Sequence, residues 1–370
     1  MNQTNSSDPS LLSLRVGPAQ YMNREGVIQD SGHSILPWGN RALISGGKRA
    51  LAAAGKDLME SLEKFEIAYE RHLFTGECCP ENITVIRSKA EDFKANLIIG
   101  VGGGKSLDTA KATAAELQIP VICIPTIAAT CAATTAMSVL YTEKGIFNKA
   151  LHLPRSPSLV LVDPRIIAQA PVIYLESGIL DSLAKWYEGR AVYKGLQDPD
   201  IRTSVAIQLA EVLHKGFRQH SVKAVSLVRQ QKVDESLVQV IDLVFLVTGM
   251  IQSLTKGTLF SGIPHAIHNG ITTLEEGHRL LHGIKVGYGI VVQLYVENGP
   301  DQEFQEVVSF FKDLELNPSF KGLHLPYTRE IVLRVAERAA NDPYIGPVTY
   351  AVTKEMLASA MEDLEGKFGH

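Results

Sequence analysis

Between residues 41 and 163 the chain alternates short apolar runs with longer segments rich in Ala, Leu and Lys. The apolar runs have the length and composition of buried strands, and the segments between them are typical of helices. Repeated strand–helix–strand units require a parallel sheet that helices cover on both faces. We therefore predict a Rossmann-like α/β fold for this part of the chain. Strands are expected at 41–47, 95–101, 119–126 and 157–163, and helices at 48–65 and 105–117.

After residue 163 strand-like runs become scarce, and long Ala- and Leu-rich segments replace them. This change predicts an α/β domain over 1–165 and an all-α domain over 166–370, a division that suits a chain of 370 residues. The cleft between two such domains is the expected place for an active site. Residues 12–21 are expected to add one more strand. The helices of the second domain are expected at about 176–194, 201–216, 236–260, 328–341 and 354–366.

The stretch GVGGGKSLDTAK, residues 100–111, lies between a predicted strand and a predicted helix. It is not a P-loop, which needs a glycine where Ile99 stands. It is also not a complete dinucleotide fingerprint, because Lys105 occupies the place of the last glycine. Glycines nevertheless let the backbone approach a ligand closely, and the amides at a helix start favour an anion. The loop therefore indicates phosphate binding, with a tight turn that holds no ligand as the alternative.

Charge, cysteine content and hydropathy narrow the class of protein. A net charge of −4 gives no basic surface for nucleic acid. Four cysteines without the spacing of a zinc knuckle or a disulfide framework indicate a reducing compartment. The polar N-terminus shows no signal peptide, and the longest apolar stretch, 237–254, contains Asp242 and Gln252, which favours a buried helix over a membrane span. We expect a cytoplasmic protein that binds neither nucleic acid nor a membrane.

Four of the eleven histidines lie close together in the stretch HAIHNGITTLEEGHRLLH. His265 and His268 are three residues apart and could share a helix face, and His282 lies where a helix could begin or end. Asp181 lies among small and apolar residues, where an unpaired charge would be costly. Two imidazoles and one carboxylate suit a catalytic divalent metal with an open position. The alternatives are histidines that cap helices and an ion pair between Asp181 and Lys185.

Five motifs occur in matching order and together resemble those of one family. They are GGGKSLDTAK, PTIAAT followed by SVLYT, GILDSLAKWYE, HAIHNG and HGIKVGYG. As a set they resemble the glycerol dehydrogenase branch of the iron-containing alcohol dehydrogenases, over roughly residues 40–295. The resemblance implies an NAD(P)-dependent oxidoreductase that interconverts a small alcohol and a carbonyl compound. It also implies a dinucleotide-binding α/β domain and a helical domain that holds one divalent metal, zinc or alternatively iron.

The resemblance also implies roles for individual residues. The metal ligands would be Asp181, His265 and His282. His268 would lie close to the metal without being a primary ligand, and it is our candidate for relaying a proton towards solvent. The pyrophosphate of NAD or NADP would be contacted by Gly103, Gly104 and Lys105. Other residues of the cofactor site would be Asp108, Thr126, Thr135, Met137 and Tyr141.

Two positions depart from the family's pattern. Cys131 stands where glycerol dehydrogenases carry an aspartate that contacts the polyol, and this segment resembles the hydroxycarboxylate dehydrogenases of the family. Loss of a carboxylate beside the metal would admit a substrate that carries its own carboxylate, whereas the alternative is a neutral exchange for a small buried thiol. After the 41–47 strand no carboxylate is present for the adenosine ribose, and Lys48 and Arg49 follow. These cations would tolerate the 2′-phosphate of NADP, unless both face water.

We therefore predict a 2-oxo acid/2-hydroxy acid dehydrogenase in which Cys131 lines the substrate site, with glycerol and dihydroxyacetone as the alternative pair. A lyase similar to dehydroquinate synthase is a remote alternative, because its set of substrate-binding Lys and Arg residues is not evident. A binding protein that has lost catalysis is disfavoured by the intact set of metal ligands. The expected partners are a small-molecule substrate and further copies of the chain, in a homo-oligomer.

Overall fold

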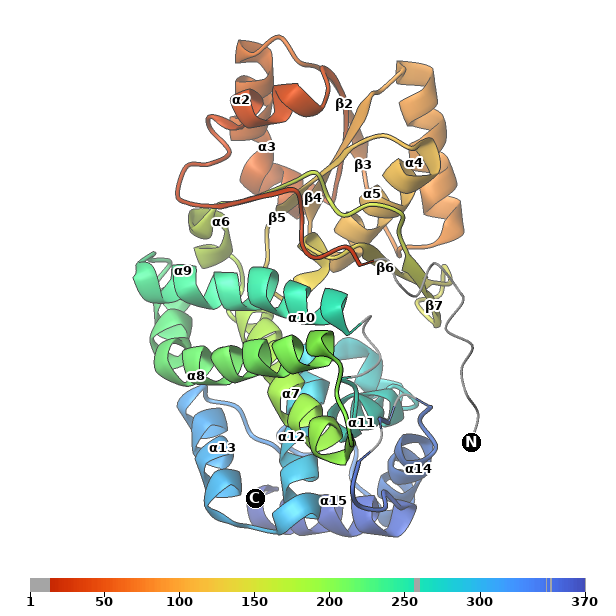
Figure 1. Ribbon diagram of the computed structural model, residues 1–370, viewed down its shortest axis with the longest axis vertical. Coiled ribbons are helices and arrows are strands. Elements are labelled where there is room, and N and C mark those ends of the chain that lie inside the picture. Colours follow the sequence, from red (N-terminus) through yellow and green to blue (C-terminus); the bar gives the residue numbers. More distant parts are fainter. Residues whose placement is uncertain (1–13, 256–259, 344, 347, 370) are drawn as a thin grey trace.

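A computed structural model describes residues 14–255, 260–343, 345, 346 and 348–369, and Figure 1 shows an α/β half beside a helical half. The predicted α/β fold is confirmed: a six-stranded sheet, parallel throughout, has the order β1-β8-β5-β4-β2-β3. All four predicted strands are present. The sheet consists of β1 (Gln20–Asn23), β2 (Arg41–Gly46), β3 (Ala68–Leu73), β4 (Leu97–Gly102), β5 (Val121–Pro125) and β8 (Leu159–Val162).

Alternate strand residues point to opposite faces of the sheet and divide its core into two layers. On one face Ile99 and Ile124 pack with the helices α2 (Ser31–Ile35) and α3 (Lys48–Lys64). On the other face Ile98 and Cys123 belong to a cluster that includes residues of α4 (Pro80–Phe93) and α5 (Gly104–Leu117). This second cluster continues into the helical half, so the two halves share one hydrophobic core.

Some elements of this half are not predicted by the sequence patterns. The strand β3 lies at the edge of the sheet with mostly exposed side chains, and therefore has no apolar run. The helix α4 and an antiparallel hairpin of β6 (Met137–Tyr141) and β7 (Phe147–His152) are further additions. The strand expected at 12–21 corresponds to β1, which begins only at Gln20; residues 12 and 13 lie outside the described part of the chain.

Within the described residues every element after β8 is helical (Figure 1). All predicted helices are present, although α8 continues well beyond residue 216. The segment expected at 236–260 is divided by a π-helical turn at Leu243–Val247. Its residues 256–259 lie outside the described part of the chain. The patterns do not predict α11, α12 and α13. The helices are α6 (Pro164–Ala168), α7 (Ile173–Gly195), α8 (Ile201–Arg229), α9 (Glu235–Asp242), α10 (Thr248–Leu254), α11 (Ile263–Ile271), α12 (His282–Asn298), α13 (Gln302–Asp313), α14 (Arg329–Ala340) and α15 (Lys354–Phe368).

The stretch Glu235–Leu254 is the one part of the described chain that is long and apolar enough to cross a membrane. Half of its apolar window is buried inside the fold. Its Asp242 accepts hydrogen bonds from Tyr21 Oη at 2.8 Å and from Asn23 Nδ2 at 2.7 Å. Such packing is typical of a core helix. These bonds join β1 to the helical half, across the domain division at residue 165 that we propose.

Candidate metal and cofactor site

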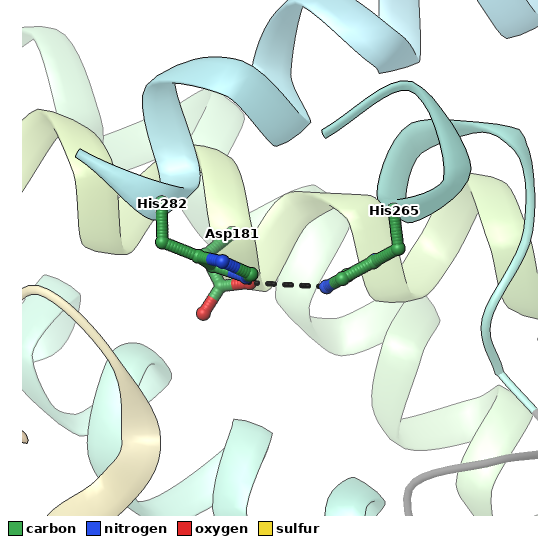
Figure 2. Close-up of side chains that lie close together, drawn as sticks. All are labelled: Asp181, His265 and His282. Carbon is green, nitrogen blue, oxygen red and sulfur yellow. Dashed lines mark ion pairs between the residues drawn. The ribbon is translucent and has the colours of Figure 1, made fainter. Parts of the chain in front are cut away.

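Three side chains from three helices converge on one point (Figure 2). Asp181 lies on α7, His265 lies on α11, and His282 is the first residue of α12. Asp181 Oδ1 lies 3.2 Å from His282 Nε2 and 3.5 Å from His265 Nε2. One possible ligand atom of each residue lies within 4.8 Å of the others. The predicted trio is thus brought together, and one carboxylate with two imidazoles fits a divalent cation.

The charge of Asp181 is stabilised within this cluster. Burial alone would raise the pKa of Asp181, but the imidazoles of His282 and His265 hold it well below its usual value. The alternative partner of Asp181, Lys185, is directed elsewhere. Its Nζ donates to the carbonyl oxygen of Phe260 at 3.3 Å and lies 3.9 Å from Glu188 Oε2. The cluster therefore keeps an anionic donor beside two imidazoles.

Glycine at the start of α12 places His282 beside Asp181. The backbone amide of Gly283 donates to Ser177 Oγ at 3.1 Å. A Cβ atom at Gly283 would lie 1.8 Å from the carbonyl oxygen of Ser177, and one at Gly287 would lie 2.6 Å from Leu180 Cδ1. Since no side chain fits at these two positions, α12 can approach α7 closely. This close crossing sets the position from which His282 faces the carboxylate.

His268 contacts the cluster from the far side of His282. The distance between His268 Nε2 and His282 Nδ1 is 2.9 Å, and His268 Nδ1 lies 3.0 Å from Asn269 Oδ1. Burial, together with the neighbouring His282, lowers the pKa of His268 well below its usual value. A neutral His268 can bridge His282 and Asn269. The arrangement supports an orienting role for His268, and its predicted role in proton relay stays a prediction.

The glycine loop joins β4 to α5 at the carboxyl edge of the sheet. Gly102 has a φ of 141°, which favours glycine, and a Cβ atom at Gly103 would lie 2.6 Å from Ile127 Cδ1. The backbone conformation thus favours glycine at position 102, and the side chain of Ile127 leaves little room for a Cβ atom at position 103. Because the N-cap residue Gly103 offers no capping side chain, the first amides of α5 are left for an anion. The tight turn and phosphate binding are therefore compatible.

Lys105 carries the positive charge of this loop and is paired with Glu77. Lys105 Nζ lies 2.5 Å from Glu77 Oε1, and the lysine side chain is 58% exposed. The carboxylate of Glu77 is only 16% exposed, and its Oε2 has no hydrogen-bond partner among the described residues. Glu77 therefore holds Lys105 at the loop, and the predicted contact of Lys105 with a phosphate stays a prediction.

Asp108 is buried, and its carboxylate is engaged inside the fold. Its Oδ1 lies 2.8 Å from Lys111 Nζ, and its Oδ2 accepts a hydrogen bond from the Val139 amide at 3.0 Å. Through these contacts Asp108 helps to position the segment after β5, and its predicted contact with the cofactor stays a prediction. The fully buried Lys111 Nζ also donates to three backbone carbonyls of that segment, those of Ala132, Thr135 and Met137.

The segment after β5 connects the glycine loop to the histidine cluster. Thr126 donates its amide to the Gly102 carbonyl at 3.1 Å, and a Cβ atom at Gly104 would lie 3.4 Å from Thr130 Oγ1. The next residue, Cys131, is half-buried. Burial raises the pKa of its thiol to about 12, and the nearby carboxylate of Asp181 acts in the same direction. Cys131 is thus a neutral thiol near the carboxylate of Asp181.

Tyr141 ends β6 in the hairpin beside this segment. Its ring packs edge to face against Phe147, and burial raises its pKa to about 12. Its backbone amide donates to the Cys78 carbonyl at 2.8 Å. These contacts anchor the hairpin, and the predicted contact of Tyr141 with the cofactor stays a prediction.

Three buried or paired charges near the site are not singled out by the sequence patterns: Glu77, Lys111 and Glu188. Glu188 had one available signal, because it follows Asp181 by two helical turns and so shares its face of α7. Glu77 had none, since its partner Lys105 comes from another element. Lys111 pairs with Asp108 three residues earlier on α5, but the three carbonyls that it binds lie in the segment after β5. The predicted interdomain cleft also stays a prediction. Two cavities of the described structure, of ≈ 670 Å³ beside α15 and ≈ 550 Å³ at the β3 edge, lie away from the cluster.

Comparisons with known proteins agree on one family. Residues 18–164 match the family described as iron-containing alcohol dehydrogenase. The chain is 32% identical to a glycerol dehydrogenase of Thermotoga maritima, with 90% of each chain covered. It is 34% identical to hydroxycarboxylate dehydrogenase A of Escherichia coli, over 95% of this chain and 96% of that one. Its fold matches the crystal structure of a glycerol dehydrogenase from Schizosaccharomyces pombe with a TM-score of 0.86, at 26% identity, over 95% of this chain and 90% of that one.

Proposed function

The chain belongs to the iron-containing alcohol dehydrogenase family and is similar to its glycerol dehydrogenases, and from this premise we propose that it oxidises a small polyol, with glycerol as the first candidate. It is an NAD(P)-dependent oxidoreductase of the alcohol dehydrogenase type. The observation that carries the proposal is the cluster of Asp181, His265 and His282 in a chain of this family. The relatives named glycerol dehydrogenase support a polyol better than the 2-oxo acid that Cys131 favours.

In this proposal Asp181, His265 and His282 hold one divalent metal, with zinc as our first choice. The bound metal would act as a Lewis acid on the substrate oxygen, while the nicotinamide would accept or return the hydride. The amides that begin α5 would bind the pyrophosphate, with Lys105 released from Glu77 to join them. We further propose that Thr126, Thr135, Met137 and Tyr141 line the cofactor, and that Lys111 and Asp108 keep their segment in place. Such positioning supplies much of the rate in bimolecular reactions.

A second candidate substrate is a 2-hydroxy acid, and one observation favours it. Cys131 lies near Asp181 as a neutral thiol, so its side chain would not repel a substrate carboxylate. Unit charges about 4 Å apart near a protein surface repel by about 4 kcal/mol. A relative named hydroxycarboxylate dehydrogenase is also similar to this chain over nearly its whole length. The size of the repulsion makes the two candidates separable by a single substitution.

We expect the wild-type protein to oxidise glycerol with NAD faster than it turns over any 2-oxo acid. The assay follows NADH at 340 nm with glycerol, dihydroxyacetone, 2-oxobutyrate and 2-oxoglutarate. Replacing Cys131 by aspartate should lower kcat/KM for the 2-oxo acids by at least about tenfold, because about 1.4 kcal/mol of repulsion suffices for that factor. The value for glycerol should change less.

If the wild-type protein has a higher kcat/KM for a 2-oxo acid than for glycerol, the polyol proposal is wrong and the second candidate substrate is favoured. Cys131→Ser is the matched control, because it keeps a neutral side chain of similar size. If Cys131→Asp and Cys131→Ser change the substrate ratio equally, the charge argument is wrong. Steady accumulation of NADH also excludes the lyase alternative, which would turn over no cofactor.

Acceptance of NADP is proposed from the first turn of α3. Lys48 and Arg49 are exposed there, directly after the end of β2 at Gly46. Each exposed ion pair with the 2′-phosphate would contribute up to about 1 kcal/mol. We expect the double variant Lys48→Ala/Arg49→Ala to raise the KM for NADPH by about tenfold and to leave that for NADH within about twofold. Unchanged KM values for both cofactors would show that the two cations face water, and an equal rise for both would contradict a specific contact with the 2′-phosphate.

A further inference from the structure

Glu188 lies directly behind His265, on the side opposite the candidate metal. Its Oε1 lies 2.7 Å from His265 Nδ1, while His265 Nε2 is the atom that faces Asp181. The side chain of Glu188 is fully buried, and its Oε2 has no hydrogen-bond partner among the described residues. Lys185 Nζ, at 3.9 Å from this oxygen, supplies the nearest opposite charge. A buried carboxylate is costly unless it is paired and hydrogen-bonded.

The same oxygen of Glu188 also caps the helix that carries His265. It accepts hydrogen bonds from the backbone amides of Gly262, at 2.8 Å, and His265, at 3.2 Å. Gly262 is the N-cap residue of α11 and offers no side chain of its own. The carboxylate therefore satisfies amides that the helix leaves unpaired and interacts favourably with its dipole. It fixes the start of α11 and the ring of His265 together.

The direction of this hydrogen bond determines which nitrogen of His265 can bind a metal. An ionised carboxylate can only accept hydrogen bonds, so Nδ1 must carry the proton in this contact. The lone pair of neutral His265 is thereby assigned to Nε2, the nitrogen beside Asp181. Glu188 and Asp181 are seven residues apart on α7, which makes them neighbours along one face of a rigid helix. One helix thus presents both a candidate ligand and the group that aims a second ligand at it.

We propose that Glu188 is a positioning residue of the metal centre, which holds α11 and the ring of His265 so that Nε2 is presented to the ion. The inference rests on the proposed metal site. Groups that hold the second nitrogen of a ligating histidine typically contribute 10- to 100-fold to metal affinity. Glu188→Gln keeps the shape and an acceptor oxygen but removes the charge. It should raise the dissociation constant for zinc by about tenfold or more.

The test uses the metal-free full chain and competition between the protein and a chelator for zinc ions. Glu176→Gln is the matched control, because Glu176 is a buried carboxylate of the same helix whose Oε1 lies 3.0 Å from an Arg229 nitrogen and not at the cluster. Both variants should unfold at similar temperatures without metal, but only Glu188→Gln should lose zinc affinity. In cobalt-substituted protein, only Glu188→Gln should shift the visible absorption bands, which report ligand geometry.

Equal zinc affinity and equal cobalt spectra in wild type, Glu188→Gln and Glu176→Gln would overturn the role of Glu188. If Glu188→Gln fails to fold, Glu188→Asp serves as the second variant. Its shorter side chain keeps the charge but withdraws the acceptor from Nδ1, so it should also weaken zinc binding. Absence of zinc binding in the wild type would instead overturn the proposed metal site itself, which keeps the two failures distinguishable.

Discussion

Replacing Asp181 with alanine is expected to abolish stable metal binding and to lower turnover by more than about a thousandfold. Asp181 supplies the anionic donor of the three that meet at the candidate centre. Its carboxylate oxygen Oδ1 is the atom that both histidine nitrogens face. Without it two imidazoles remain, which is one donor fewer than the three protein ligands of catalytic zinc sites. Lewis-acid activation contributes several kcal/mol, and each 1.36 kcal/mol corresponds to a factor of ten in rate.

Zinc content by elemental analysis and steady-state rates with NAD are the two measurements for this variant. Asp242→Ala provides the control, because Asp242 is a half-buried aspartate of the same helical half, and it bonds to Tyr21 and Asn23 instead of histidines. Asp242→Ala should lose stability and keep one zinc per folded chain. If Asp181→Ala retained a full equivalent of zinc and ordinary turnover, the site would lie elsewhere.

A methyl group added at Gly283 is expected to destabilise the whole helical half and to displace His282. The new Cβ atom would lie 1.8 Å from the carbonyl oxygen of Ser177, which is backbone and cannot rotate away. Overpacking typically lowers the free energy of unfolding by about 1–3 kcal/mol. Because this clash is with the backbone, we expect a loss of about 3 kcal/mol or more. A cost of about 3 kcal/mol lowers the melting temperature of a domain of this size by roughly 6–12 °C. Zinc affinity should fall as well, because α12 begins at His282.

Gly366→Ala is the matched control for this substitution. Gly366 lies within α15, and a Cβ atom there would have no neighbour within 4 Å. Alanine in an open helical position favours the folded state by up to about 1 kcal/mol over glycine. Thermal unfolding should therefore shift upwards for Gly366→Ala and downwards for Gly283→Ala. Similar melting temperatures for wild type and Gly283→Ala would mean that α7 and α12 do not cross as closely as described.

Sequence patterns predict the central sheet well because its inner strands are continuous apolar runs. The strand β4 and the helix α5 with the glycines between them are clear from composition alone. The edge strand β3 escapes this reasoning, since a strand exposed on most of its length has no apolar run. The helix α12 escapes it for another reason, since Gly283, Gly287 and Gly289 lower its helix propensity. Their role is revealed only by packing: a Cβ atom at Gly289 would lie 2.5 Å from Pro264 Cα.

Sequence patterns also predict the candidate site only in part. Asp181 can be singled out because a charge interrupts an apolar helix, and the histidines because they are close in sequence. The function of Glu188 cannot be predicted in this way, since its partner His265 lies 77 residues further along the chain. The family motif implies that Asp108 belongs to the cofactor site. In the fold its carboxylate is directed to Lys111 and Val139, and its contact with the cofactor stays a prediction.

We propose that one divalent cation is held by Asp181, His265 and His282. Anomalous diffraction from crystals of the zinc-loaded protein, measured on both sides of the zinc absorption edge, would locate this ion. We expect one strong peak per chain, in bonding contact with the carboxylate of Asp181 and with Nε2 of both histidines. A zinc peak bound by other residues, with none among these three, would contradict it.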